Sequence, residues 1–258
     1  MKIIPLVNSS FQTLENLINV QELGTWEWNI QTGIVRVNRF WYAMLGYDEA
    51  EPEMSMQLWQ DMIHRDDIES VMEAVQEHLA GRTSIYRSEF RLRSKEGGWV
   101  WVEAKGKIVE YGENHSPLYF CGTHTDITTR KTEKQAIEAA RNAYRFLYRN
   151  TSDAVLLLKD GKIAESNPAA LRLFGCDNES QLLHAHPASI SPALQPDGSE
   201  SSQRADAAMA AAAAGEETTL TWEFSRMDGE RFRADVSMQS YSGAEADTII
   251  MLIGNEAM

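Results

Sequence analysis

The stretch GTWEWNIQTGIVRVNRFWYAMLGY, residues 24–47, carries the signals that decide the fold. Trp26 and Trp28 alternate with polar residues, which is the period-2 pattern of a half-buried strand. The turn-forming QTG follows and IVRVN returns as a partner strand, so the pattern predicts a β-hairpin. The next residues, RFWYAML, predict a short helix that Gly46 ends.

Helices are expected on both sides of this hairpin. Ser9 or Ser10 can cap the first, and its apolar residues recur at spacings of three and four: Phe11, Leu14, Leu17 and Ile18. Residues 56–82, MQLWQDMIHRDDIESVMEAVQEHLAGR, predict a helical turn and then a longer helix that Gly81 ends. Three strands follow, in SIYRSEFRLRS, WVWVEAKGKIVEY and PLYFCGTHTDI, and KEGG joins the first two as a hairpin turn.

The second half of the chain repeats this order of elements. DAVLLLKDGKIAESN predicts strand, turn and strand, PAALRLFGC a short helix, and TTLTWEFSRMDGERFRADVSMQSY a hairpin before the last strand, TIIMLIG. An offset of 129 residues places Asn38 on Asn167. An offset of 132 residues places Phe90 on Trp222. The chain is therefore predicted to be a tandem repeat with a short insertion in its second copy.

These segments resemble two successive PAS domains. The resemblance includes FCGTHTDITTRK in the first half and NTSDAVLLLKDGKIAESNPAALRLFGC in the second. The resemblance runs from about residue 10 to residue 254 and implies an α+β fold. Each domain would be a five-stranded antiparallel sheet with short helices on one face, and a helical linker would join the two. In this family the space between sheet and helices can hold a small molecule. The predicted segments are an N-terminal amphipathic helix (1–20), the first PAS domain (21–128), a helical connector (129–149) and the second PAS domain (150–258).

The predicted connector has an apolar seam of its own. Its apolar residues recur at spacings of three and four, at Ile137, Ala140, Tyr144 and Leu147. Three arginines lie outside that seam, namely Arg141, Arg145 and Arg149. The seam either packs on its own domain or pairs with a second chain. About two heptads are too few for an isolated coiled coil, so a homodimer would also need contacts from the domains or the N-terminal helix. A stiff helix joined to a strand can transmit a small shift that a flexible linker would lose.

Composition and charge narrow the class of protein. The 258 residues are 43% hydrophobic and 24% charged, as in a soluble globular protein. The net charge is −8 over residues 1–128, +4 over 129–149 and −10 over 150–258, which disfavours nucleic-acid binding by either half. No apolar run suits a signal peptide or a membrane span, and the two cysteines lack metal-ligand spacing. We therefore expect a cytoplasmic protein with reduced thiols.

Candidate binding residues come from the aromatic-rich first half and from its counterparts in the second. Six of the seven tryptophans lie in the first half, and they predict either core packing or an aromatic lining for a planar ligand. The resemblance to redox-sensing PAS domains makes FAD the first cofactor hypothesis, although IHRDD replaces the His-Pro-Asp run that such domains tend to carry. The candidate residues for cofactor or ligand binding are Trp28, Asn38, Trp41, Trp59, Arg91, Trp101, Asn167, Leu171 and Trp222.

Other sites have less support from the residues present. His78 lies on the helix that carries the axial ligand in some haem-binding PAS domains, so haem is the second cofactor hypothesis. His184 and His186 have no carboxylate or thiol cluster beside them, which argues against a metal site. RADAAMAAAAAG, residues 204–215, predicts an alanine-rich helix, either a displaceable lid over an aliphatic pocket or a lightly packed surface helix.

The resemblance implies a sensory module rather than an enzyme. No nucleophile–base pair, glycine-rich phosphate loop or metal signature is present in the sequence. Such a module would sense an intracellular cue through a small ligand or cofactor and relay it through the connector to an effector, such as a histidine kinase or diguanylate cyclase. Because the chain ends at MLIGNEAM without such an effector, we expect a sensory fragment or a protein that acts on a separate partner. The alternatives are a dimerisation scaffold with side-chain-filled pockets and a FAD-based redox sensor in the first half.

Overall fold

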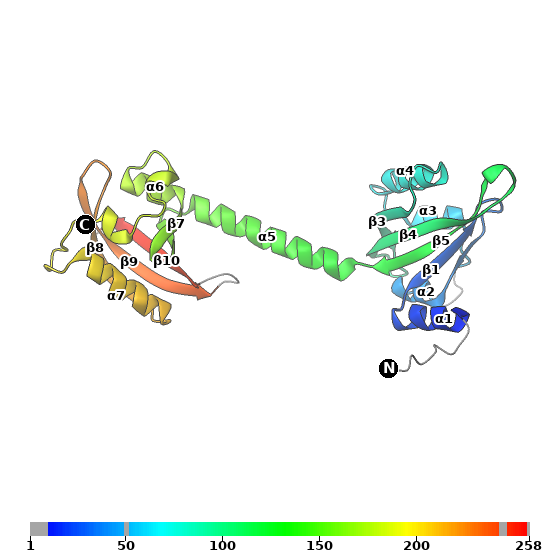
Figure 1. Ribbon diagram of the computed structural model, residues 1–258, viewed down its shortest axis with the longest axis horizontal. Helices are drawn as coiled ribbons and strands as arrows, with labels where there is room; N and C mark the ends of the chain where they lie inside the picture. The colour runs from blue at the N-terminus through cyan, green and yellow to red at the C-terminus, as the bar shows by residue number, and fades with distance from the viewer. Residues whose placement is uncertain (1–9, 49–51, 243–246, 257–258) are drawn as a thin grey trace, which may run out of the picture. The chain divides into compact units, whose positions relative to one another are not determined.

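The computed structural model describes residues 10–48, 52–242 and 247–256. The chain divides into two compact units, residues 1–137 and 138–258. Each unit contains a five-stranded antiparallel sheet, with strand order β2-β1-β5-β4-β3 in the first and β7-β6-β10-β9-β8 in the second (Figure 1). The two orders correspond strand for strand. The predicted fold class is therefore confirmed.

The first unit has three of its helices inserted between the second and third strands, as the sequence predicts. Its elements, with the helix that follows them, are α1 Ser10–Val20, β1 Gly24–Asn29, β2 Val35–Val37, α2 Arg39–Met44, α3 Met56–Met62, α4 Ile68–Leu79, β3 Tyr86–Arg93, β4 Trp99–Tyr111, the 3₁₀ helix η1 Glu113–His115, β5 Pro117–Asp126 and α5 Thr128–Asn150. Leu14 and Leu17 on α1 are more than half exposed. Ser9, the other predicted cap of this helix, lies outside the described residues.

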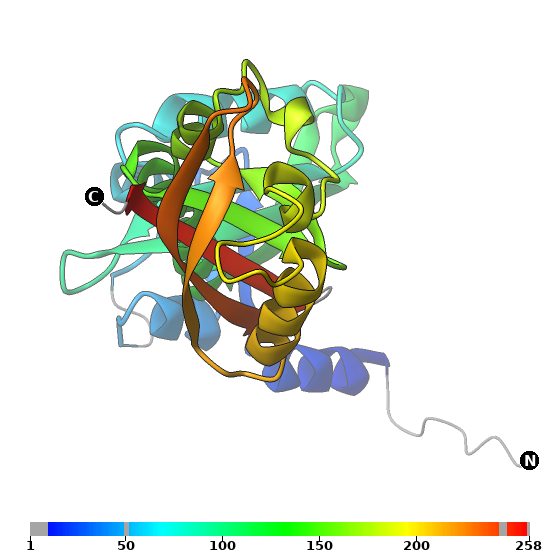
Figure 2. The ribbon, with the colours of Figure 1, turned by 90° about the vertical axis from the view of Figure 1, so that its left-hand side faces the viewer.

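The second unit repeats this arrangement with a longer insertion before its third strand. Its elements are β6 Ala154–Lys159, β7 Lys162–Ser166, α6 Pro168–Phe174, the 3₁₀ helices η2 Glu179–Gln181 and η3 Pro187–Ile190, α7 Ser201–Ala213, β8 Thr218–Ser225, β9 Arg231–Ser242 and β10 Asp247–Glu256. Figure 2, in which this unit faces the viewer, shows α7 beside the sheet, where it packs on β8, β9 and β10.

An asparagine fixes the same corner in both units. Asn38 caps α2 by accepting from the Trp41 N–H, and its side chain also accepts from the Thr25 N–H of β1. Asn167 caps α6 and accepts from the Val155 N–H of β6. Each side chain thus joins the start of the first helix to the first strand. The sequence offset that aligned these two asparagines corresponds to one shared structural role.

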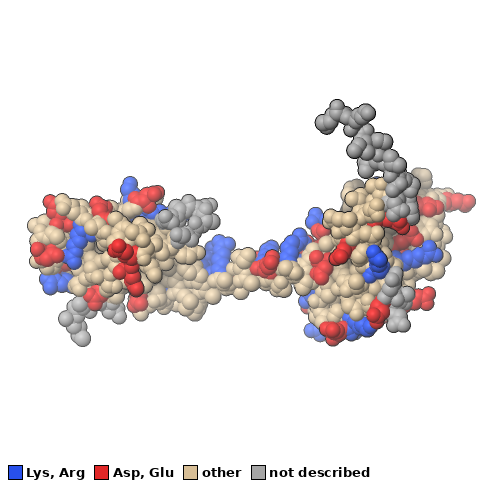
Figure 3. Space-filling view, turned by 90° about the horizontal axis from the view of Figure 1, so that it is seen from below, with Lys and Arg blue, Asp and Glu red and all other residues tan. Residues whose placement is uncertain are grey.

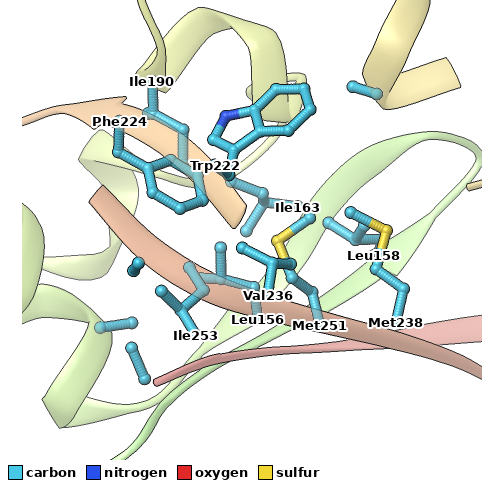
Figure 4. Close-up of a cluster of buried hydrophobic side chains, with 14 of the residues drawn as sticks. Leu156, Leu158, Ile163, Ile190, Trp222, Phe224, Val236, Met238, Met251 and Ile253 are labelled. Carbon is cyan, nitrogen blue, oxygen red and sulfur yellow. The ribbon is translucent and has the colours of Figure 1, made fainter. Parts of the chain in front are cut away.

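The core of the second unit is filled by side chains. Trp222 and Phe224 of β8 lie over aliphatic and methionine side chains from β6, β7, β9 and β10 (Figure 4). The alanine-rich helix α7 belongs to this core, because Ala205, Met209 and Ala212 are buried against it. Small side chains let the helix approach the sheet closely, so α7 is a packed element of the domain.

Charge on the described surface follows the pattern expected from the sequence. Lys and Arg side chains gather along α5, whereas acidic side chains are spread over both sheet-containing units (Figure 3). Among the described residues, no helix is both long enough and apolar enough to cross a membrane.

Candidate ligand-binding site

A cavity lies inside the first unit, lined by four strands of the sheet and by helices α2, α3 and α4. Its volume is about 40 Å³. The lining is aromatic and aliphatic and contains no Asp, Glu, Lys or Arg: Trp26, Trp28, Val35, Val37, Trp41, Met54, Met56, Trp59, Val75, Tyr86, Phe120 and His124. A space of this size admits a molecule of a few non-hydrogen atoms or a small water cluster.

Two glycines make room for Trp26 on the floor of this cavity. Gly106 of β4 and Gly122 of β5 are direct register partners, and Gly122 also faces Trp26 of β1. A Cβ on Gly122 would lie 2.6 Å from Cζ2 of Trp26, and a Cβ on Gly106 would lie 2.5 Å from Cη2 of the same ring. Any larger residue at either position would therefore displace the indole.

His124 is a neutral, fully buried member of the lining. Its Nδ1 accepts a hydrogen bond of 2.8 Å from Nε1–H of Trp41. Burial lowers the pKa of His124 to about 3, so the ring carries no charge near neutral pH. Because Nδ1 is the acceptor, the single proton of the neutral ring resides on Nε2, which makes Nε2 a hydrogen-bond donor.

Four buried polar atoms around the cavity have no hydrogen-bond partner among the described residues. They are Nε1 of Trp26, Nε1 of Trp28, Nε1 of Trp59 and the hydroxyl oxygen of Tyr86, and we refer to these four atoms as the donor set. An indole N–H can only donate, and a tyrosine hydroxyl can donate or accept. Leaving a buried donor unpaired costs about 1–3 kcal/mol. None of these atoms faces the space itself, because the accessible surface of the cavity is wholly apolar.

The structure separates the nine candidate residues into distinct groups. Trp28, Trp41 and Trp59 line the cavity together. Arg91 and Trp101 are register partners whose strand neighbours, such as Phe90, are buried in the core, so alternation places them on the outer face of the sheet. Neither Arg91 nor Trp101 belongs to the cavity lining.

The remaining four candidates have structural contacts. Asn38 and Asn167 are the caps described above, and Nδ2 of Asn167 also donates to the carbonyls of Tyr148 and Asp153. Trp222 is a core residue whose Nε1–H donates to Oγ of Ser191 over 2.8 Å. Leu171 packs at the edge of the second core and borders an open hollow between α5 and α6.

That hollow is formed by residues of the second unit, 138–258. It is lined by charged and aromatic side chains: Arg141, Tyr144, Arg145, Tyr148, Arg149, Glu165, Ser166, Pro168, Leu171 and Glu179. The hydroxyls of Tyr148 and Ser166 are buried without a described partner. Burial and the nearby Glu165 carboxylate raise the pKa of Tyr148.

The histidines considered as ligands are engaged by the protein. Nε2 of His78 accepts from the Ile108 N–H at 3.2 Å, so Nδ1 carries the proton and donates to Thr83 at 3.0 Å. Both ring nitrogens of His78 are thus occupied, and the haem hypothesis loses its axial ligand. His186 caps η3 and lies 3.1 Å from Asp206. Within the described residues, no cluster of His, Cys, Asp or Glu could hold a metal ion.

Sequence reasoning missed several lining residues, namely Trp26, Tyr86, Phe120 and His124. Period-2 alternation was the available signal, since Trp26 shares a strand face with Trp28, and Phe120, Gly122 and His124 share a face of β5. Tyr86 opens β3 four residues before the buried Phe90, again on the inner face.

The outer face of the first sheet is tied to the start of α5. The Trp101 ring centre lies 5.1 Å from the Arg91 guanidinium and 4.5 Å from the Lys131 ammonium. Glu89 pairs with both Arg130 and Lys131 at 2.7 Å. The hydrogen bond from Lys131 and the neighbouring positive charges hold the pKa of Glu89 below its usual value. These five side chains form what we call the outer-face cluster.

Cavity and cluster lie on opposite faces of the same strand. Phe90 of β3 is buried, and its ring centre lies 5.8 Å from that of Trp59 and 5.7 Å from that of His124. Its chain neighbours Glu89 and Arg91 belong to the outer-face cluster. Adjacent residues of β3 therefore contact the cavity lining on one face and the start of α5 on the other.

Comparison with known proteins matches both halves of the chain. A model of the PAS fold matches residues 34–124, and a model of the PAS domain matches residues 152–254. The chain belongs to the PAS family. Its two halves are PAS domains in tandem, and each match falls inside the corresponding sheet-containing unit. PAS domains of this kind are sensory domains of signal-transduction proteins.

The similar proteins are sensors. The tandem PAS chain is 30% identical over 121 residues to hybrid signal transduction histidine kinase A of Dictyostelium discoideum, covering 44% of this chain but only 6% of that kinase. A sensory box histidine kinase/response regulator from Burkholderia thailandensis is 26% identical, with a TM-score of 0.46, over 52% of this chain and 98% of that one. A sensory box histidine kinase/response regulator domain from Geobacter sulfurreducens is 19% identical, with a TM-score of 0.40, over 46% of this chain and 96% of that one.

Proposed function

We propose that this chain is a ligand-gated sensory module whose first PAS domain binds a small molecule and passes the change through α5 to an effector. The observation that carries the proposal is the cavity of about 40 Å³ between the sheet and the helices of the first domain, whose accessible surface is wholly apolar. Native cores contain few voids larger than a water molecule, so this space is a candidate site for a small, largely apolar molecule. The kinase names of the similar proteins support a histidine kinase as the effector.

The flavin alternative has no support in this geometry. The cavity measures about 40 Å³, whereas pockets for drug-sized ligands measure roughly 300–1,000 Å³. The lining also has no lysine or arginine to face the phosphates of FAD. Arg91, the cation expected to contact such a cofactor, lies on the outer face and pairs with Asp67 at 2.7 Å. The residues present do not fit FAD.

The relay would begin at β3. The Trp59 ring lines the cavity and contacts Phe90, so a molecule that displaces this ring would change how it packs on Phe90. Because Glu89 holds Arg130 and Lys131, movement of this strand would alter the first turn of α5. The connection is reinforced where Oγ1 of Thr128 accepts from the Trp101 N–H at 3.0 Å. One helix, Thr128–Asn150, begins with that turn and ends in the second unit.

Ligand binding is tested by asking what the purified chain carries. The chain is denatured, and small molecules in the supernatant are identified by mass spectrometry, for the original protein and for Trp28→Ala. We expect a compound released in stoichiometric amount from the original and at least ten-fold less from Trp28→Ala. Trp99→Ala, at an exposed ring outside the cavity, should retain it. The sensory proposal fails if nothing is released and no member of a metabolite panel raises the melting temperature.

The relay is tested by a double-mutant cycle across the sheet. Trp59→Leu, Glu89→Gln and the double variant are unfolded in urea, and we expect a coupling free energy of at least about 0.5 kcal/mol. Glu77→Gln is the matched control, because Glu77 forms an exposed ion pair with Arg82 away from α5. If the effects of Trp59→Leu and Glu89→Gln are as additive as those of Trp59→Leu and Glu77→Gln, the proposed relay is wrong.

A second property, self-association, is favoured by α5 itself. Ile137, Tyr144 and Leu147 of the predicted seam are 69%, 52% and 68% exposed. We propose that a second copy of the chain covers this seam, as expected for a signalling homodimer. Ile137→Glu should lower dimer affinity in sedimentation velocity, whereas Asn142→Glu, which adds the same charge on the opposite side of the helix, should not. Equal sedimentation of both variants and the original would contradict the dimer.

A further inference from the structure

The hollow between α5 and α6 differs from the cavity of the first domain in both size and chemistry. Its volume is about 810 Å³, within the range of roughly 300–1,000 Å³ that is usual for small-molecule sites. About half of its accessible surface is polar, so polar atoms face the space itself. All of its lining residues belong to the second unit, and Figure 1 shows α6 beside the C-terminal end of α5.

One wall of this hollow is a face of α5 on which arginine and tyrosine alternate. The residues that form it lie at positions i, i+3, i+4, i+7 and i+8, so they share one side of the helix: Arg141, Tyr144, Arg145, Tyr148 and Arg149. The rings of Tyr144 and Tyr148 stack with their centres 5.6 Å apart and an angle of 22° between their planes. This wall therefore presents three positive charges beside two stacked aromatic rings.

The three guanidinium groups have no counter-charge within the described part of the chain. Arg141, Arg145 and Arg149 are exposed, and they form no ion pair with another described residue. Arg149 lies in the last turn of α5, where a cation stabilises the helix end. Arg141 and Arg145 lie further from that end, and like charges four residues apart repel each other. Helix stability thus accounts for Arg149 but not for the other two.

The opposite wall adds apolar area and two carboxylates. Pro168 and Leu171 come from α6, Glu165 from β7 and Glu179 from η2. Glu179 is already engaged, because it accepts a hydrogen bond of 2.9 Å from the Ser166 N–H. Three arginines against two glutamates leave the lining with a net charge of +1.

The two walls together select a class of occupant. A cation would be repelled by the α5 wall, and a hydrocarbon would cover guanidinium groups without offering them an acceptor. An anion with a flat apolar body matches both walls. Guanidinium groups bind phosphate or carboxylate through charge-assisted hydrogen bonds and also stack on aromatic faces.

We propose that this hollow binds an aromatic anion, a molecule that joins a phosphate or carboxylate group to a flat ring system. Its anionic group accepts hydrogen bonds from Arg141 and Arg145, and its ring system packs between Tyr148 and Leu171. Such a molecule bridges α5 and α6 and so holds the end of the connector on its domain. The proposal does not depend on the cavity of the first domain.

Isothermal titration of the full chain at pH 7 provides the test. Two aromatic anions, 1-naphthyl phosphate and 1-naphthoate, are compared with 1-naphthol, inorganic phosphate and the 1-naphthylmethylammonium ion. We expect at least one aromatic anion to bind about ten-fold or more tightly than each of the other three probes, and its binding to weaken as salt is added. The comparison of the two anions shows whether phosphate or carboxylate is preferred.

Variants of the α5 wall locate the binding site. Arg145→Gln and Arg141→Gln each remove one guanidinium and should each weaken binding of the preferred anion about ten-fold or more, as expected for one hydrogen bond between charged groups. Arg172→Gln is the matched control, because Arg172 is an exposed residue of α6 outside the lining, and it should change the affinity less than about two-fold. Melting temperatures confirm that the variants fold, and the second α5 variant decides if one does not.

Three results would overturn the proposal. If neither aromatic anion binds, the hollow is not a site for this class. If inorganic phosphate, 1-naphthol or the ammonium ion binds as tightly as the aromatic anions, the ligand class is wrong. If Arg172→Gln weakens binding as much as the two α5 variants do, the anion responds to positive charge in general and the location is wrong.

Discussion

Acidification from pH 7 to pH 5 is expected to destabilise the first PAS domain through one side chain, His124. The folded ring has a pKa of about 3 because it is buried and neutral, against an ordinary value of 6.5. In the unfolded chain the ring takes up a proton below about pH 6.5, and in the folded chain it does so only near pH 3. The resulting stability is fully present above pH 6.5 and is lost as the pH falls towards 3.

The size of the effect follows from the two pKa values. Proton uptake by the unfolded ring between pH 7 and pH 5 lowers the free energy of unfolding by about 2 kcal/mol. The full difference between the folded and unfolded pKa values of His124 corresponds to about 5 kcal/mol. Carboxylates with lowered pKa, such as Asp67 and Glu89, act in the same direction but mainly below about pH 4.5. Above pH 5 the Glu89 carboxylate contributes at most about 0.2 kcal/mol, and the Asp67 carboxylate under about 0.1 kcal/mol.

Urea unfolding at pH 7, 6 and 5, followed by tryptophan fluorescence, measures this dependence. The fluorescence reports chiefly on the first domain, which holds six of the seven tryptophans. His124→Gln keeps an acceptor for Trp41 and removes the titration, so it should be less pH-dependent than the original by about 2 kcal/mol over this range. His115→Gln, at an exposed histidine, is the control. An unchanged pH dependence in His124→Gln would show that the ring is not held neutral by burial.

Two further substitutions test the packing that shapes each domain. Gly122→Ala would place a Cβ 1.9 Å from the Lys105 carbonyl oxygen, so it should lower the free energy of unfolding in urea by at least about 3 kcal/mol. In the control variant Gly98→Ala the new Cβ meets nothing closer than 3.4 Å, and the loss should be under about 1 kcal/mol. Equal losses in the two variants would contradict the close approach at Gly122. Asn167→Ala removes four hydrogen bonds in a buried corner, one of which caps α6, and should lower the free energy of unfolding by about 2–4 kcal/mol. Asn178→Ala removes an exposed helix cap and should lower it by under about 1 kcal/mol. A loss below about 1 kcal/mol in Asn167→Ala would contradict its anchoring role.

The fold was predictable because its signals are local. Alternation at Trp26 and Trp28, the turns at QTG and KEGG, and glycine after each short helix are all read within a few residues. The tandem repeat was predictable for the same reason, since one offset aligns Asn38 with Asn167. The length of α5 followed from an uninterrupted charged stretch without proline or glycine.

The composition of the site was less predictable because it depends on which strands pair. Trp26 faces the cavity over Gly122 and Gly106 only through the β1–β5–β4 register, which no local pattern reveals. Arg91 and Trp101 were selected for residue type, although alternation with the buried Phe90 already placed them on the other face. Hydrogen-bond partners were the least predictable feature. Nothing in the sequence distinguishes Trp41 from Trp28, and only the fold places His124 beside Trp41.

The comparison of the two domains suggests why one copy keeps a cavity. In the second domain the segment between α6 and β8 supplies Ser191 to bind the Trp222 N–H and the alanine face of α7 to complete the core. The corresponding segment of the first domain forms α3 and α4 instead, and the equivalent of Trp222 is Phe90, which carries no polar atom. Its indole donors sit instead on β1 and α3, where no side chain supplies a partner. The second domain therefore fills its core with its own side chains, whereas the first encloses a cavity of about 40 Å³.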